Sequence, residues 1–116
     1  MPPVYMIELD DIERDFLETG LLQWGGVVAM TDALARAIGH RDAVDFYAES
    51  ARCADRIAGG VGITTDAWRR CLTACEIAFA SESLGLGHEW DDFSEFDPNE
   101  TYQAMRRLQW KIAELG

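Results

Sequence analysis

The chain has 116 residues, 48% hydrophobic and 10% aromatic, which predicts one domain over residues 1–116 that needs no disulfide or metal to fold. Its net charge is −11, from 21 acids against 10 bases. This charge disfavours direct binding to nucleic acid and to anionic membranes, because both require lysine and arginine. The sequence shows neither a signal peptide nor an apolar run of about 18 residues, so we expect a cytoplasmic protein that does not span a membrane.

The first third of the chain predicts two helices and a turn between them. Residues 1–7 are expected to be extended, and residues 4–9 fit a short strand. An amphipathic helix with acids on its polar face is predicted over residues 9–20, with Gly20 as its C′ glycine. Trp24 precedes two glycines, so we expect it to fill the core from a turn. A short helix capped by Thr31 is predicted over residues 31–38.

A longer helix is predicted from the N-cap Asp42 to Ala58, ahead of Gly59 and Gly60. Apolar residues recur along it at intervals of three and four, which indicates a buried face. The alanines in this set would allow close approach of another helix. The expected buried residues are Val44, Tyr47, Ala51, Ala54 and Ala58.

The second half of the chain predicts the centre of the fold. A helix over about residues 66–83 has little polar surface, so other helices should surround it. Asp97 followed by Pro98 predicts the start of a last helix. That helix should bury Tyr102, Met105, Leu108, Ile112 and Leu115. The predicted fold class is all-α, an irregular orthogonal bundle of about five helices around the central apolar helix.

Three short motifs resemble those of a group of small actinobacterial proteins with no assigned function. They are Trp24-Gly25, the helix start from Thr31 to Gly39, and the run from Glu76 to Ser81. The resemblance spans about residues 22–112. It implies one helical domain and no activity.

The charge is concentrated in two zones. Residues 1–18 hold six acids and one arginine, and residues 82–100 hold seven acids with no lysine or arginine. Within the second zone, residues 88–97 alternate aromatic and acidic side chains, a pattern that fits aromatic anchors steered by carboxylates onto a basic partner. The alternative is a connecting loop whose aromatics fold into the core. The candidate partner-binding residues are Trp90, Asp91, Asp92, Phe93, Glu95 and Phe96.

Other reactive side chains have simpler structural interpretations. Glu76 lies in the most apolar run, where a carboxylate must be paired, hydrogen-bonded or protonated. One structural interpretation pairs Glu76 with an arginine such as Arg52, Arg56 or Arg106. Another places Glu76 at the rim of the helix. Cys71 and Cys75 share a helix face and are expected to pack in the core, since no second ligand pair accompanies them. We expect no catalytic residue, cofactor or metal.

Three functions follow as hypotheses. The first is an inhibitor or immunity-type protein that neutralises a basic protein partner, such as a nuclease-like toxin, through residues 90–96. The second is a homodimer or scaffold built on large apolar residues, which include Trp24, Trp68 and Trp110. Two alternatives are open for Trp110. It is either an exposed contact residue or a side chain covered by the N-terminal segment. The third is a small-ligand binder or enzyme centred on Glu76.

Overall fold

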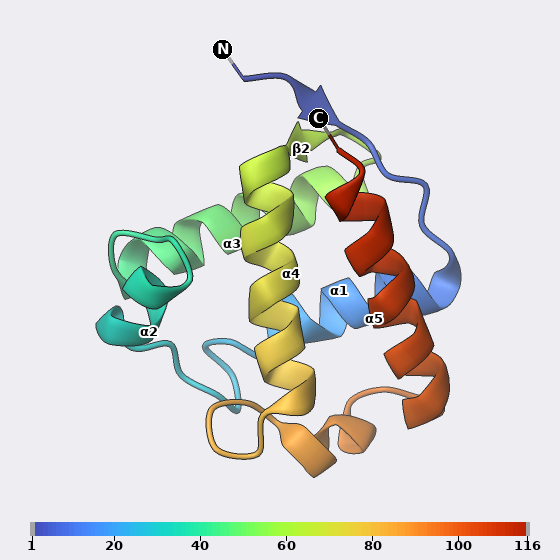
Figure 1. Cartoon of the computed structure of the whole chain (residues 1–116). Helices are drawn as coiled ribbons and strands as arrows, with labels where there is room; N and C mark the ends of the chain where they lie inside the picture. The colour runs from blue at the N-terminus through green and yellow to red at the C-terminus, as the bar shows by residue number, and fades with distance from the viewer. Residues whose placement is uncertain (1, 116) are drawn as a thin grey trace.

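Helix α4 (Thr65–Ala80) passes through the middle of the molecule (Figure 1). In the computed structural model, which describes residues 2–115, helices α1 (Asp11–Leu22) and α3 (Ala43–Ala58) cross behind α4. Helix α5 (Pro98–Ala113) runs beside it. The predicted all-α bundle around a central apolar helix is therefore confirmed.

Two short strands and two short helices complete the fold. Strand β1 (Val4–Tyr5) pairs antiparallel with β2 (Ile63–Thr64), so a strand forms in the segment where the sequence allowed one. Helix α2 (Asp32–Ala37) packs on α3, and the 3-10 helix η1 (Gly87–Asp92) packs on α4. The indole N–H of Trp68 donates to the carbonyl oxygen of Tyr5 at 2.9 Å, which ties β1 to the start of α4.

Helix α1 begins and ends two residues later than predicted. Asp10 is its N-cap, and the carboxylate of Glu13 accepts a hydrogen bond from the Asp10 backbone N–H, which completes a capping box. Gly20 lies inside the helix, so its assignment as a C′ glycine is wrong. A Cβ at Gly20 would lie 2.6 Å from Cys75 Sγ and 2.9 Å from Cys75 Cα. Glycine is therefore required by the close approach of α1 to α4, and not by a helix end.

Helix α3 has the predicted bounds and N-cap, but its buried face is not the predicted one. Val44 is 76% exposed, and Ala51 and Ala58 are also exposed, while Tyr47 and Ala54 are half-buried. The large side chains Phe46 and Ile57 select the inward face, because they bury more apolar area than alanines do. The buried residues of α3 are Phe46, Ser50, Cys53 and Ile57.

Helix α4 ends at Ala80, earlier than predicted, because the chain turns back against its last turn. The backbone N–H of Leu86 donates to the carbonyl oxygen of Ala78 at 2.8 Å. Gly85 lies so close to this turn that a Cβ there would clash with the carbonyl oxygen of Ile77. This return places η1 under the end of α4.

Helix α5 starts as predicted, with Asp97 as N-cap and Pro98 in the first turn. Met105, Leu108 and Ile112 are buried, as expected, and Leu115 is half-buried. Tyr102 is 47% exposed, so its assignment to the buried face is wrong. Trp110 is 66% exposed, which answers the open question in favour of a solvent-facing position.

The predicted role of Trp24 is confirmed. Its side chain is buried between α1 and α3, and its indole N–H donates to the carbonyl oxygen of Ala74 in α4 at 3.2 Å. The ring meets Phe46 edge-on at a centroid distance of 5.8 Å. Of the helices within residues 2–115, none combines the length and apolarity needed to cross a bilayer.

Candidate functional site

Trp90 is a core residue and not a surface anchor. It is 1% exposed, and its ring packs 5.6 Å from Phe16 in α1 and 5.1 Å from Phe79 in α4. The 3-10 turn of η1 directs this side chain inward and leaves its acidic neighbours outside. The structure therefore contradicts the assignment of Trp90 to a partner-contact surface, and supports the alternative interpretation for this aromatic.

The other candidate residues of the segment remain accessible. Asp91, Asp92 and Glu95 are exposed, and Phe93 is 40% exposed between them. Phe96 is half-buried. An exposed phenyl ring thus lies in sequence among three exposed carboxylates, while Trp90 holds the segment on the core.

The acids at the start of α1 are neutralised by the bases of α5. Arg107 Nη2 lies 3.1 Å from Asp10 Oδ2, and Lys111 Nζ lies 2.8 Å from Glu13 Oε1. Burial opposes ionisation of Asp10, but the Glu13 backbone N–H and the charges of Arg107 and Lys111 outweigh it and lower the pKa of Asp10. The first acidic zone is therefore partly a structural ion-pair cluster.

The acids of the second zone are not neutralised in this way. Glu82 lies 2.7 Å from His88 Nδ1, and this hydrogen bond lowers the pKa of Glu82 and raises the pKa of His88. Across residues 2–115, no ion pair involves Asp91, Asp92 or Glu95. Their charges face solvent and remain available to a partner.

The two acidic zones meet at one contact between α1 and the segment after η1. Ser94 Oγ donates to Asp15 Oδ2 at 2.7 Å. Asp15 therefore contacts the segment that carries the exposed carboxylates of Asp91, Asp92 and Glu95. We call Asp15, Asp91, Asp92, Phe93 and Glu95 the acidic surface.

An apolar groove of about 490 Å³ lies between α1 and α3. Glu18 of α1 and Asp55 of α3 line it on opposite sides, and both are exposed. The face of α3 that the sequence analysis assigned to the core forms one wall of this groove. The apolar lining includes Leu21, Leu22, Trp24, Tyr47, Ala51 and Ala54.

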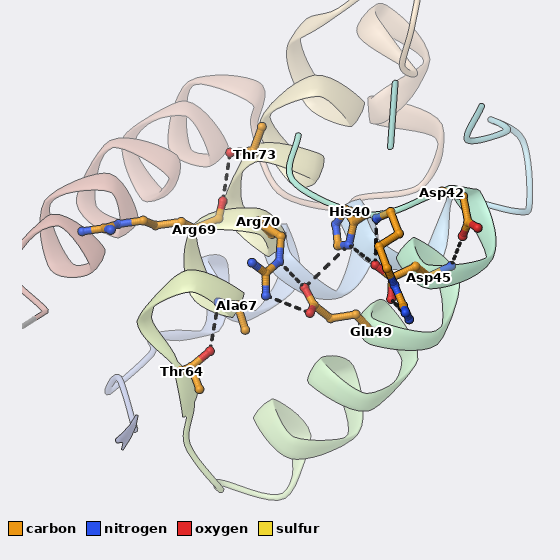
Figure 2. A network of polar contacts seen from close by, with 10 residues as sticks. His40, Asp42, Asp45, Glu49, Thr64, Ala67, Arg69, Arg70 and Thr73 are labelled. Atoms are coloured by element: carbon orange, nitrogen blue, oxygen red, sulfur yellow. Dashed lines mark hydrogen bonds and ion pairs between the residues drawn. The ribbon is translucent and has the colours of Figure 1, made fainter. Parts of the chain in front are cut away.

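A polar cluster joins the loop before α3 to α3 and α4 (Figure 2). The guanidinium of Arg70 donates to both carboxylate oxygens of Glu49, from Nε at 2.7 Å and from Nη2 at 2.9 Å. This hydrogen bonding raises the pKa of Arg70. His40 is 6% exposed, and its Nδ1 lies 3.8 Å from Glu49 and 3.9 Å from Asp45. The bidentate pair fixes α3 against α4.

The sequence does not predict a role for His40 in this cluster. Burial lowers the pKa of His40, against the opposing influence of Glu49. The imidazole packs edge-on against Phe46 at 5.1 Å and is shielded from solvent, so it is not placed for acid–base work on a bound substrate. One sequence feature pointed to this cluster. Asp45 and Glu49 follow His40 closely and are four residues apart, which places both carboxylates on the same face of α3.

Among residues 2–115, the carboxylate that is fully buried is that of Glu13 and not that of Glu76. Glu13 is 0% exposed, whereas Glu76 is half-buried at the rim of α4 and accepts a hydrogen bond from Gln109. Gln109 in turn accepts one from Arg106, so the expected arginine is linked to Glu76 indirectly. The capping-box spacing from Asp10 to Glu13 was the only sequence signal for the buried acid.

The three cysteines are buried and unpaired, so the predicted core packing of Cys71 and Cys75 is confirmed. Burial raises the pKa of the Cys75 thiol well above its usual range. Among residues 2–115, no group of three or more His, Cys, Asp or Glu side chains is arranged to hold a metal ion.

Comparisons of the chain with protein-family models, with curated proteins and with solved structures gave no significant match. The resemblance to small actinobacterial proteins therefore stays a prediction.

Proposed function

We propose that this protein binds a basic protein partner through the acidic surface. The observation that carries the proposal is the unequal neutralisation of the two acidic zones. Arg107 and Lys111 are engaged by Asp10 and Glu13, whereas Asp91, Asp92 and Glu95 have no basic side chain in ion-pair range within residues 2–115. A concentration of unpaired carboxylates attracts a cationic protein and raises its association rate.

Phe93 supplies the apolar contact of the proposed interface. Carboxylates alone bind weakly in water, because exposed ion pairs contribute only about 0–1 kcal/mol each. An aromatic ring that is 40% exposed among them adds area that a partner's pocket can desolvate. Phe96, three residues further along the chain, is half-buried and is the second aromatic residue of the proposed interface.

The kind of partner that fits best is a cationic enzyme that the protein neutralises, as an immunity protein neutralises a nuclease-like toxin. A nuclease needs a basic surface to hold a phosphate backbone, and an acidic protein can occupy that surface instead. We place this activity in the cytoplasm, where unpaired thiols such as those of Cys53, Cys71 and Cys75 persist.

The test is a tagged pull-down from the native organism, washed at low and at high salt, with mass spectrometry of the retained proteins. The variant Asp91→Asn/Asp92→Asn/Glu95→Gln removes three charges with little change in shape. The matched control Glu8→Gln/Glu100→Gln/Glu114→Gln removes three exposed charges outside the acidic surface.

We expect one stoichiometric basic protein that salt releases, that the first variant loses and that the control retains. Exposed ion pairs are screened over about 8 Å at physiological ionic strength, so the salt wash separates charge-driven capture from apolar capture. Equal capture by both variants would reject the acidic surface. Recovery of the protein alone would favour the homodimer hypothesis.

A further inference from the structure

The groove between α1 and α3 has the form of a site for a helix. Its α3 wall carries Ala51 and Ala54, whose small side chains let another backbone approach closely. Trp24 and Leu21 are buried beneath it, and Leu22 is 74% exposed at its edge. Amphipathic helices bind such grooves through apolar residues at intervals of three and four.

The groove is held open by contacts that do not depend on an occupant. The Tyr47 hydroxyl accepts a hydrogen bond from the Met30 backbone N–H at 2.9 Å, which fixes the ring at one end. Trp24 is fixed by its bond to Ala74 in α4. An occupant would therefore meet a formed surface and would not need to reorganise it.

The charges beside the groove indicate which occupant fits. Glu18 on one wall and Asp55 on the other are exposed, and no ion pair within residues 2–115 involves either. A helix lying between them would satisfy both if it carried lysine or arginine on each side of its apolar stripe. A second copy of this chain would instead bring a net charge of −11 against a net charge of −11.

We infer that the groove binds an amphipathic helix of a protein partner, with an apolar face flanked by lysine or arginine. The inference deepens the proposed function, because it assigns to the same basic partner a helix that occupies this groove. The two sites are close along α1, since Glu18 lies three residues after Asp15 and on the same side of the helix. A partner that contacts the acidic surface can therefore reach the groove.

The experiment is a selection from a displayed library of amphipathic helical peptides, with the positions flanking the apolar stripe randomised. Selected peptides are then measured by fluorescence anisotropy against two variants of α3. Ala51→Leu fills the groove, and Ala48→Leu adds the same bulk at an exposed position of α3 outside the lining. Leucine is nearly as good a helix former as alanine, so both variants should fold.

We expect enrichment of lysine and arginine at the randomised positions, and a Kd that rises about tenfold or more in Ala51→Leu but stays near wild type in Ala48→Leu. The charge-reversed variant Glu18→Lys/Asp55→Lys should weaken these peptides and favour ones with glutamate in the same positions. Failure to enrich any peptide, or equal binding to both leucine variants, would overturn the inference. Peptides enriched without a charge preference would overturn the assigned partner chemistry.

The peptide measurements also separate this inference from the proposed function. Selected peptides should bind the Asp91→Asn/Asp92→Asn/Glu95→Gln variant nearly as well as wild type, because the groove is intact. If the groove variants keep the captured protein and the acidic-surface variant loses it, the groove inference fails and the proposed function stands. The reverse pattern rejects the acidic surface and keeps the groove.

Discussion

Gly20 of α1 and Cys75 of α4 lie in direct contact, and this contact sets how closely the two helices cross. A Cβ on Gly20 would approach Cys75 Sγ to 2.6 Å and Cys75 Cβ to 2.7 Å. Both residues are buried, Cys75 completely. A glycine that looks like a helix terminator in the sequence is thus a packing residue at the centre of the bundle.

We therefore expect Gly20→Ala to destabilise the protein, although alanine is the better helix former. The helix-propensity gain is about 0.5–1 kcal/mol, whereas forcing a methyl group into a packed core costs about 1–3 kcal/mol. Urea unfolding followed by circular dichroism measures the difference. Gly26→Ala is the control, since its nearest contact would be an ordinary 3.4 Å. A Gly20→Ala protein as stable as wild type would contradict the packing argument.

Glu13→Ala should lower the free energy of unfolding by about 1–3 kcal/mol. The change removes the acceptor for Lys111 and for the Asp10 backbone N–H. The loss is moderated because Lys111 and Arg107 are partly exposed and can regain water. Asp11→Asn, an exposed acid in the same helical turn, should change stability by less than about 0.5 kcal/mol. Equal effects of the two substitutions would show that Glu13 has no special role.

The pH dependence of stability should change when His40 is replaced by leucine. Burial lowers the pKa of His40 below 6.5 in the folded protein, so below that pH the unfolded chain binds a proton that the folded one does not. The contribution of neutral His40 to the free energy of unfolding is therefore fully present above pH 6.5. As the pH falls from 6.5 toward the folded pKa, this contribution is lost, by at most about 1.4 kcal/mol per pH unit. Urea midpoints between pH 5 and 7.5 should vary less in His40→Leu than in wild type.

His88 provides the opposite control. Its hydrogen bond to Glu82 raises its pKa in the folded protein, so its contribution is present below pH 6.5 and is lost as pH rises through the folded pKa. His88→Gln should therefore leave the acid-side loss unchanged. Parallel pH curves for wild type and His40→Leu would show that His40 does not contribute.

Trp90→Ala and Phe93→Ala should separate stability from binding. Trp90 is buried against Phe16 and Phe79, so its truncation should cost about 3–5 kcal/mol. Phe93 is accessible, and its truncation should change stability by about 0.5 kcal/mol or less. On the proposed function, Phe93→Ala at the same time weakens capture of the basic partner. A stable Phe93→Ala protein with undiminished capture would remove the ring from the interface.

Most helix starts were predictable from the sequence because caps are local. Thr31, Asp42, Thr64 and Asp97 each accept a hydrogen bond from a backbone N–H two or three residues further along. The central position of α4 was also predictable, since an apolar surface on all sides of a helix requires neighbours on all sides. Both features are encoded by residues close together in the sequence and can be recognised without knowing the tertiary contacts.

The candidate site was predictable only in part. The unbalanced charge of residues 82–100 is a property of the sequence, and it is the reason that the segment around Phe93 was proposed as a binding surface. Which of its aromatics face solvent depends on the turn of η1 against Phe16 and Phe79, and so Trp90 was assigned to the wrong side. The groove was missed because Ala51 and Ala54 fit the spacing of a buried stripe equally well.

Composition and local patterning thus determined that this chain is acidic, helical and built around α4. Tertiary structure alone decided which charges are neutralised, because Asp10 and Arg107 are 97 positions apart and only the packing of α1 on α5 brings them together. It also decided that Gly20 is a contact and that one face of α3 is a groove. The sequence of α3 allows more than one of its faces to be the buried one. The side-chain volumes of Phe46, Ile57 and their neighbours in the core decide which face that is.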